Sequence, residues 1–189
     1  MPQYLPAFEF SFPFRLRIRQ LAGVLLAMFA VANAGAAAKT SAATDNPLAG
    51  TWILEDAYDL LGDGQRAEPY GPRPAGLLLV GPDGRYSLQI FHSTRTPFAS
   101  GDKLRATDEE YRAAVVGMST HVGRIEVDGA GRSLTFHIEH AAFPNWDGRA
   151  QTRPFELRDE VLSYHVPKTP TGATPVSVWR RVTRYGAMD

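Results

Sequence analysis

The chain has 189 residues, of which 44% are hydrophobic and 21% charged, a composition that supports one globular domain with a buried core. Twenty Lys and Arg residues balance twenty Asp and Glu residues, so the sequence lacks the excess positive charge of a nucleic-acid-binding protein. It contains no cysteine, which excludes disulfide bonds, a thiolate nucleophile and cysteine-ligated metal sites.

Residues 1–34 have the layout of a secretory signal peptide. Three arginines between residues 15 and 19 precede a twelve-residue apolar run from Leu21 to Ala32, and small residues follow the run. The run is shorter than the roughly 20 apolar residues that cross a bilayer. We predict cleavage after Ala34, or within the triplet at residues 36–38, and therefore a periplasmic or secreted protein with no stable membrane span after cleavage. An uncleaved anchor or a core helix is the alternative.

Cleavage at this point changes the charge balance of the mature chain. It leaves 17 basic and 19 acidic side chains, a net charge of −2, because the leader contains three arginines and one glutamate. Residues 35–47 are rich in Ala, Thr and Ser and show no hydrophobic periodicity, which is typical of a flexible linker. We therefore place the folded domain at residues 48–184 and a C-terminal tail at residues 185–189.

The rest of the chain predicts eight short strands and one helix. The turn signals Pro82-Asp83-Gly84 and Asp128-Gly129-Ala130-Gly131 each join two strands into a hairpin. The helix is expected from Thr107 to about Gly117, between the third and fourth strands, where Thr107 and Glu110 can form a capping box. The predicted strands are Thr51–Ala57, Gly76–Val80, Arg85–His92, His121–Val127, Ser133–His140, Ala150–Leu157, Val161–Val166 and Val176–Thr183.

This order of elements predicts an all-β fold. Eight consecutive strands joined mainly by hairpins can close into an antiparallel up-and-down barrel, which removes the exposed edges of the sheet. A barrel of about eight strands has room for side chains or for one small ligand. The predicted fold is therefore a closed eight-stranded antiparallel up-and-down barrel, with a two-sheet sandwich as the alternative.

Short motifs follow one another in a specific order along residues 48–182. They are Gly50-Thr51-Trp52, Gly76-Leu77-Leu78, Pro82-Asp83-Gly84-Arg85-Tyr86, Arg95-Thr96-Pro97-Phe98-Ala99-Ser100, Glu126-Val127-Asp128, His137-Ile138-Glu139, Phe143-Pro144-Asn145-Trp146, Arg153-Pro154-Phe155-Glu156-Leu157 and Trp179-Arg180-Arg181. In this order and spacing the motifs resemble the bacterial lipocalin-like domain family, a calycin-type barrel. The resemblance implies a closed eight-stranded barrel that binds a small ligand, and it implies little chemistry. His121 departs from the family pattern, which has a tyrosine two residues before Gly123.

Trp52 is predicted to have a structural role at the closed end of the barrel. It follows a glycine at the start of the first strand, where a large ring can plug the barrel. A guanidinium from the last strand, that of Arg180 or Arg181, can lie over this ring and stabilise it by about 0.5–2 kcal/mol.

His137 and Glu139 share one face of a predicted strand, and two interpretations of this face remain open. Leu134, Phe136 and Ile138 alternate with them and are expected to point inward, so the polar pair would face solvent. The family motif includes both residues, which favours a place in a wet cavity and contact with a ligand. A third metal ligand is not evident, so we predict neither a metal site nor another cofactor.

Arg153 and His121 are the polar side chains most strongly predicted to point into the barrel. Arg153 shares strand parity with Phe155 and Leu157, and His121 shares it with Ile125. A buried guanidinium needs a partner, either a carboxylate of the protein or an anionic group of a ligand. His121 could contact the ligand or be a satisfied core residue.

Two loops are candidates for the mouth of the barrel. One contains Arg95 and Phe98, the other contains Asn145 and Trp146, and both are rich in aromatic residues and bounded by Gly or Pro. These side chains could contact an apolar ligand. Alternatively, Phe98 and Trp146 could plug the end of the barrel and Asn145 could form a turn.

The sequence thus favours a binding protein over an enzyme. It has no Gly-x-Ser-x-Gly, no phosphate-binding glycine loop and no His-Glu-x-x-His. The first hypothesis is a barrel that holds a largely apolar molecule whose polar or acidic head lies near Arg153 and His121. One alternative is an isomerase or cyclase that uses His121, or His137 with Glu139, for acid–base chemistry. The other is a filled barrel with a structural or interaction role.

Overall fold

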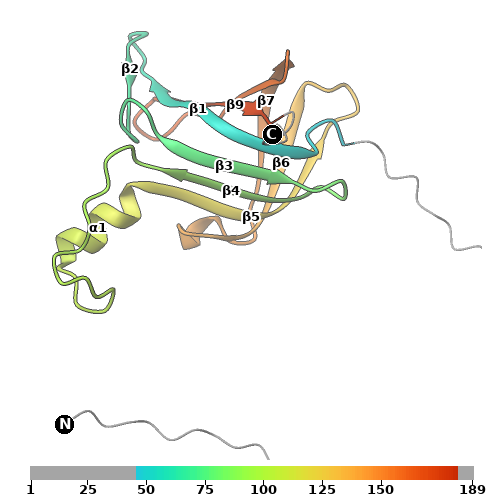
Figure 1. Cartoon of the computed structure of the whole chain (residues 1–189). Helices are drawn as coiled ribbons and strands as arrows, with labels where there is room; N and C mark the ends of the chain where they lie inside the picture. The colour runs from blue at the N-terminus through green and yellow to red at the C-terminus, as the bar shows by residue number, and fades with distance from the viewer. Residues whose placement is uncertain (1–45, 183–189) are drawn as a thin grey trace, which may run out of the picture. The chain divides into compact units, whose positions relative to one another are not determined.

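The computed structural model describes residues 46–182 (Figure 1). The predicted signal peptide, most of the predicted linker and the predicted C-terminal tail lie outside the described residues. Within them the chain forms nine strands, one α-helix and one 3-10 turn. In chain order these are β1 (Gly50–Leu60), β2 (Arg66–Ala67), β3 (Ala75–Val80), β4 (Arg85–Phe91), α1 (Asp108–Val116), β5 (Met118–Val127), β6 (Ser133–Ala141), the 3-10 turn (Pro144–Trp146), β7 (Ala150–Arg158), β8 (Val161–His165) and β9 (Thr174–Arg181).

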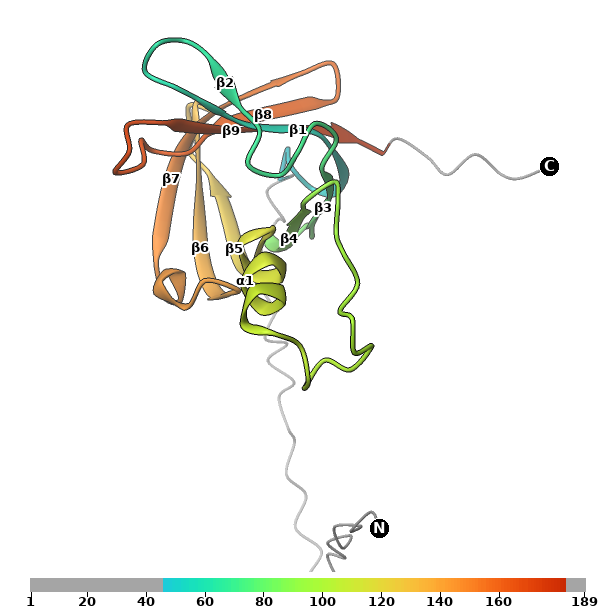
Figure 2. The ribbon, with the colours of Figure 1, turned by 90° about the vertical axis from the view of Figure 1, so that its left-hand side faces the viewer.

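Eight of the strands form a closed barrel, as the sequence predicted. The strands pair antiparallel in the order β1, β3, β4, β5, β6, β7, β8 and β9. The last strand, β9, then pairs with β1 and closes the ring (Figures 1 and 2). The ninth strand, the two-residue β2, pairs with the end of β1. The helix was predicted between the third and fourth strands, and in the structure it lies between β4 and β5. The numbering differs by one because the short strand β2 was not predicted.

The helix begins at the predicted capping box. The Thr107 hydroxyl accepts a hydrogen bond from the Glu110 backbone N–H at 3.2 Å, and the Glu110 carboxylate accepts one from the Thr107 N–H at 2.8 Å. The same carboxylate also accepts a hydrogen bond from the Ala99 N–H, which fixes the preceding loop against the helix. The helix lies beyond the ends of β4 and β5, the strands that it joins (Figure 1).

Two β-bulges interrupt the regular register. In β1 the pairing with β9 shifts between Leu54 and Asp56, so Glu55 is the additional residue. The pairing of β5 with β6 shifts at Gly123. Gly123 is required there, because a Cβ atom at this position would lie 2.0 Å from the His137 carbonyl oxygen.

The two ends of the barrel differ. The hairpin turns 81–84, 128–132 and 159–160 lie at the same end as the start of β1, and this end is filled with large apolar side chains. The longer connections, including that through α1, lie at the other end. The side chains that fill the closed end are fully buried, and they include Leu48, Trp52, Leu78, Leu134, Leu162 and Trp179.

Trp52 plugs the closed end and ties it to the segment before β1. Its indole N–H donates a hydrogen bond to the Leu48 carbonyl at 2.9 Å. The guanidinium that covers its ring is that of Arg181, whose Cζ lies 4.1 Å from the ring centroid.

Arg181 has further partners at this end, and Arg180 does not share them. The Arg181 guanidinium donates to the Pro47 carbonyl at 2.6 Å and forms an ion pair with Glu160. Arg180 points to the outer surface and forms an ion pair with Glu55. Only Arg181 therefore joins the first and last strands through the core.

Replacing Arg181 with alanine is expected to lower the free energy of unfolding by about 2–4 kcal/mol, because the variant loses the cation–π contact and several charge-assisted hydrogen bonds. Arg180→Ala is the matched control on the same strand. It removes one exposed ion pair and is expected to cost less than about 1 kcal/mol. Urea denaturation of both variants measures the difference, and equal losses would contradict the assigned role of Arg181.

Candidate functional site

The open end of the barrel contains a cavity of about 280 Å³. Apolar side chains from β4 and β9 form part of its wall, among them Leu88, Ile90 and Val176. Polar side chains also line the cavity, and they include Asp59, Tyr70, His121, Arg153, Tyr164 and Ser177. The cavity is therefore amphipathic, with ionisable groups among its lining residues.

Arg153 on β7 is the buried cation of this cavity. Its side chain takes the inward parity, as predicted, and only 3% of the residue is exposed. The guanidinium lies over the rings of Phe136 and Tyr164, with its Cζ at 4.4 and 5.1 Å from the centroids. One terminal nitrogen donates to the Gln151 side-chain oxygen at 2.7 Å.

The hydrogen bonding of Arg153 is incomplete. Its buried Nε atom has no hydrogen-bond partner among residues 46–182, and no carboxylate in this part of the chain forms an ion pair with the guanidinium. Burial lowers the pKa of Arg153, but a guanidinium remains protonated in proteins. The cavity therefore holds a positive charge without a counter-ion from the described part of the protein.

His121 on β5 lies beside Tyr86 of β4, and the two side chains form a neutral pair. The Tyr86 hydroxyl is 2.7 Å from the Nδ1 atom of His121. Burial, together with the charge of Arg153, lowers the pKa of His121 to about 3, and burial raises the pKa of Tyr86. In the tautomer in which Nδ1 accepts a hydrogen bond from the Tyr86 hydroxyl, the Nε2 atom of His121 carries the ring proton and is a hydrogen-bond donor.

Asp59 lies at the mouth of the cavity, a position that strand alternation does not predict. Trp52 and Leu54 are buried, so strict alternation along β1 predicts Tyr58 inside and Asp59 outside. The bulge at Glu55 reverses the parity, so that Ala57 is buried and Asp59 lines the cavity. Burial raises the pKa of Asp59. A bulge has no clear signal in a single sequence, so this residue could not have been found by alternation.

Trp146 lines the cavity, whereas its neighbour Asn145 is exposed on the 3-10 turn and does not. The Trp146 ring packs edge to face against His121, with 6.1 Å between the centroids, and against Phe143 at 5.6 Å. The turn that carries Trp146 is held by Asp147, whose carboxylate accepts a hydrogen bond from the Ala141 N–H. Of the predicted mouth residues, Trp146 is therefore the one that reaches the barrel interior.

His137 and Glu139 lie on the outer face of β6, away from the cavity. The His137 Nε2 atom is 3.2 Å from the carboxylate of Glu126 on the neighbouring strand. Arg85 holds Glu139 through two hydrogen bonds of 2.8 and 3.0 Å. The suggestion that this pair contacts a ligand inside the barrel must therefore be corrected, because the apolar face of β6 occupies the interior. No group of three or more metal-ligating side chains occurs in the described part of the chain.

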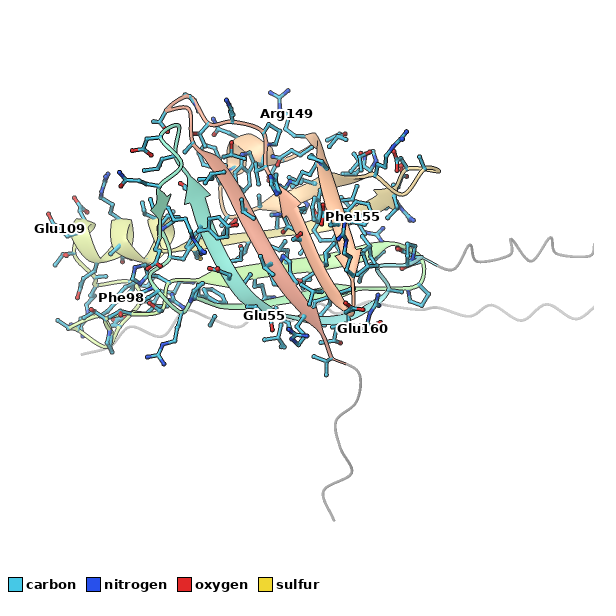
Figure 3. All side chains as sticks on the ribbon, turned by 90° about the horizontal axis from the view of Figure 1, so that it is seen from above. Glu55, Phe98, Glu109, Arg149, Phe155 and Glu160 are labelled. Atoms are coloured by element: carbon cyan, nitrogen blue, oxygen red, sulfur yellow. The ribbon has the colours of Figure 1, made fainter. Side chains whose placement is uncertain are left out.

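Arg95 and Phe98 line a second pocket, of about 560 Å³, between their loop and α1. Phe98 packs edge to face against Tyr111 of the helix, with 5.7 Å between the centroids, and Figure 3 shows Phe98 beside α1. The Arg95 guanidinium lies over the Phe91 ring. These two predicted site residues are thus placed outside the barrel, because the capping interactions of α1 hold their loop against the helix rather than across the mouth.

The sequence model of a family described as a lipocalin-like domain matches residues 49–182, the span that forms the barrel. No curated protein matches the chain. Among the described residues, no helix has the length and apolar character needed to cross a membrane.

The neutral His121 predicts a distinct pH dependence of stability. Because the folded protein takes up the His121 proton only near pH 3 and the unfolded chain takes it up near its usual value of 6.5, acidification in this window favours unfolding. As the pH is lowered from 6 to 4.5, the free energy of unfolding of the wild type is expected to fall, relative to that of His121→Gln, by about 1.4 kcal/mol per pH unit. Urea denaturation at several pH values measures this difference, and a constant difference would refute a buried neutral imidazole.

Proposed function

The chain belongs to the lipocalin-like domain family, and on that premise we propose that its barrel binds a small, largely apolar molecule with an acidic head group. The observation that carries the proposal is Arg153, a buried guanidinium in the cavity lining that has no ionic partner in the described part of the chain. The acidic head lies at Arg153, and the apolar part lies against Leu88, Ile90 and Val176.

The free energy of the buried charge supports an anionic ligand. An internal charge without a partner costs several kcal/mol even after the protein relaxes around it. A carboxylate at this position supplies the counter-ion, accepts the free hydrogen bond of Nε and can take two parallel bonds from one guanidinium. His121 also lines the cavity, and its Nε2 atom is an additional neutral donor when Nδ1 accepts the hydrogen bond of Tyr86.

The volume of the cavity limits the size of the ligand. An apolar cavity of about 150 Å³ accommodates a benzene molecule. The cavity of about 280 Å³ therefore suits a ligand with one ring, two fused rings or a short branched chain.

Acid–base catalysis has less support. The hydrogen-bond partner of His121 is the hydroxyl of Tyr86 rather than a carboxylate, and the pair His137 and Glu139 lies on the outer face. A purely structural, filled barrel is also disfavoured, since a filled barrel would leave no cavity of this size at the open end.

The proposal includes export. It is supported by the arginines at residues 15, 17 and 19, the apolar run from Leu21 to Ala32 and the small residues that follow. The absence of cysteine is compatible with an oxidising compartment such as a periplasm, where nothing in this chain could mispair.

Binding of 2-naphthoate tests the role of Arg153, because this fluorescent acid has a close neutral analogue, 2-naphthamide. The Arg153→Gln variant is expected to bind 2-naphthoate roughly 10- to 100-fold more weakly, which corresponds to the loss of one charge-assisted interaction. Binding of 2-naphthamide should change less than about threefold. Fluorescence titration measures both affinities.

Arg149→Gln is the matched control for this experiment, because Arg149 precedes β7 and projects outward (Figure 3). It is expected to leave both affinities unchanged. Equal weakening of the acid and the amide in Arg153→Gln would show a packing defect and would contradict an acid-binding site. Saturable binding of neither probe would contradict the whole proposal.

The N-terminus of the mature protein tests export. When the full sequence is expressed in a Gram-negative bacterium, we expect protein in the periplasmic fraction whose intact mass corresponds to cleavage after Ala34 or within residues 36–38. Leu25→Arg interrupts the apolar run and should leave the uncleaved chain in the cytoplasm. Wild-type protein that keeps residues 1–34 would be the contrary result.

A further inference from the structure

Two ionisable side chains lie at different depths of the cavity. Asp59 is the penultimate residue of β1 and pairs with Pro175 near the start of β9, at the end where the long connections lie. Arg153 pairs with Leu134, the second residue of β6, which is nearer to the closed end. The backbone position of Asp59 is therefore nearer to the mouth of the barrel than that of Arg153.

Asp59 and Arg153 do not satisfy each other. The two side chains form no ion pair, and the Asp59 carboxylate accepts no side-chain hydrogen bond in the described part of the chain. The remaining lining close to the mouth includes the ring of Tyr70 and the side chains of Pro69 and Thr169. Asp59 is thus a partly buried acceptor without a donor.

The bulge in β1 makes this placement specific. The neighbouring acidic residue of the strand, Asp56, follows the bulge directly and binds the Arg66 guanidinium at 2.6 Å. Glu55, the bulged residue, binds Arg180 on the outer surface. Of the three acidic side chains on β1, Asp59 is therefore the one that the bulge turns towards the cavity and leaves without a cation.

We infer that the ligand is a short dipolar acid, whose carboxylate binds Arg153 and whose opposite end carries a hydroxyl or ammonium group that donates to Asp59. This inference rests on the proposed function and adds a second specificity-determining residue to it. The apolar side chains of the lining accommodate the body of such a molecule, and the donor at its far end satisfies a carboxylate that burial has partly removed from water.

An acid with a wholly apolar tail fits the cavity less well. Its tail would cover Asp59 and leave the carboxylate desolvated without a donor, which is unfavourable. A site with a buried hydrogen-bonding group rejects ligands that lack the complementary group more strongly than it rejects ligands of slightly different size. Asp59 therefore separates dipolar acids from simple aromatic or fatty acids.

Two benzoates of the same shape test this inference. 4-(Aminomethyl)benzoate carries an ammonium group where 4-ethylbenzoate carries a methyl group, and both present a carboxylate to Arg153. We expect the protein to bind 4-(aminomethyl)benzoate roughly 5- to 50-fold more tightly than 4-ethylbenzoate in calorimetric titrations. In Asp59→Asn the preference should fall below about threefold, with binding of 4-ethylbenzoate unchanged or slightly stronger.

Asp56→Asn is the matched control, since it removes a carboxylate from the same strand that does not line the cavity. It should keep the wild-type preference, and urea denaturation of both variants verifies that they fold. Equal affinity for the two benzoates in the wild type, or a preference that survives Asp59→Asn, would overturn the role of Asp59. The acid site at Arg153 would stand in that case if both benzoates lose affinity in Arg153→Gln. Binding of neither benzoate would overturn both proposals.

Discussion

Closure of the sheet is the constraint on which the rest of this structure depends. Once β9 pairs with β1, one face of every barrel strand is enclosed, and the side chains on that face lie inside the barrel. For Leu134 and Phe136 this is favourable, since it removes apolar surface from water. For Arg153, which shares the interior with them, closure buries a charge at 3% exposure. The same hydrogen-bonded ladder that stabilises the fold therefore creates the electrostatic feature on which the proposed function depends.

Two arginines of this barrel show how differently a guanidinium can be accommodated. Arg181 covers Trp52, donates to the Pro47 carbonyl and pairs with Glu160, so its charge is balanced although its side chain is only 20% exposed. Arg153 is buried more deeply, and its contacts in the described part of the chain are the Gln151 amide oxygen and the side chains of Phe136 and Tyr164, none of them an anion. Where a guanidinium stabilises this fold, the protein supplies an anion. The missing anion at Arg153 argues for a ligand rather than for a role in stability.

Alternation in the sequence predicted the interior wherever a strand keeps its register. Arg153 and His121 were placed inside because the alternation of their strands is uninterrupted from these residues to their apolar neighbours, and His137 was among the side chains with the outward parity. Asp59 could not be predicted, because one bulged residue, Glu55, reverses the parity of half a strand. The loop residues failed for another reason. Aromatic residues in a loop suggested contact with a ligand, but Phe98 packs on α1. The Glu110 carboxylate, which caps the helix, also accepts a hydrogen bond from the Ala99 N–H and holds the loop there. Composition alone does not encode this contact.

The neutral state of His121 gains a physical meaning beside Arg153. A protonated histidine there would add a second positive charge to the cavity, but burial and the charge of Arg153 lower the pKa of His121 to about 3, so the imidazole stays neutral. Arg153 thus supplies one positive charge to the cavity, and the carboxyl group of Asp59 lies nearer to its mouth. Such a distribution favours a ligand with one acidic group that enters carboxylate first. A second acidic group on the ligand would remain near Asp59, where like charges repel and no cation of the cavity balances them.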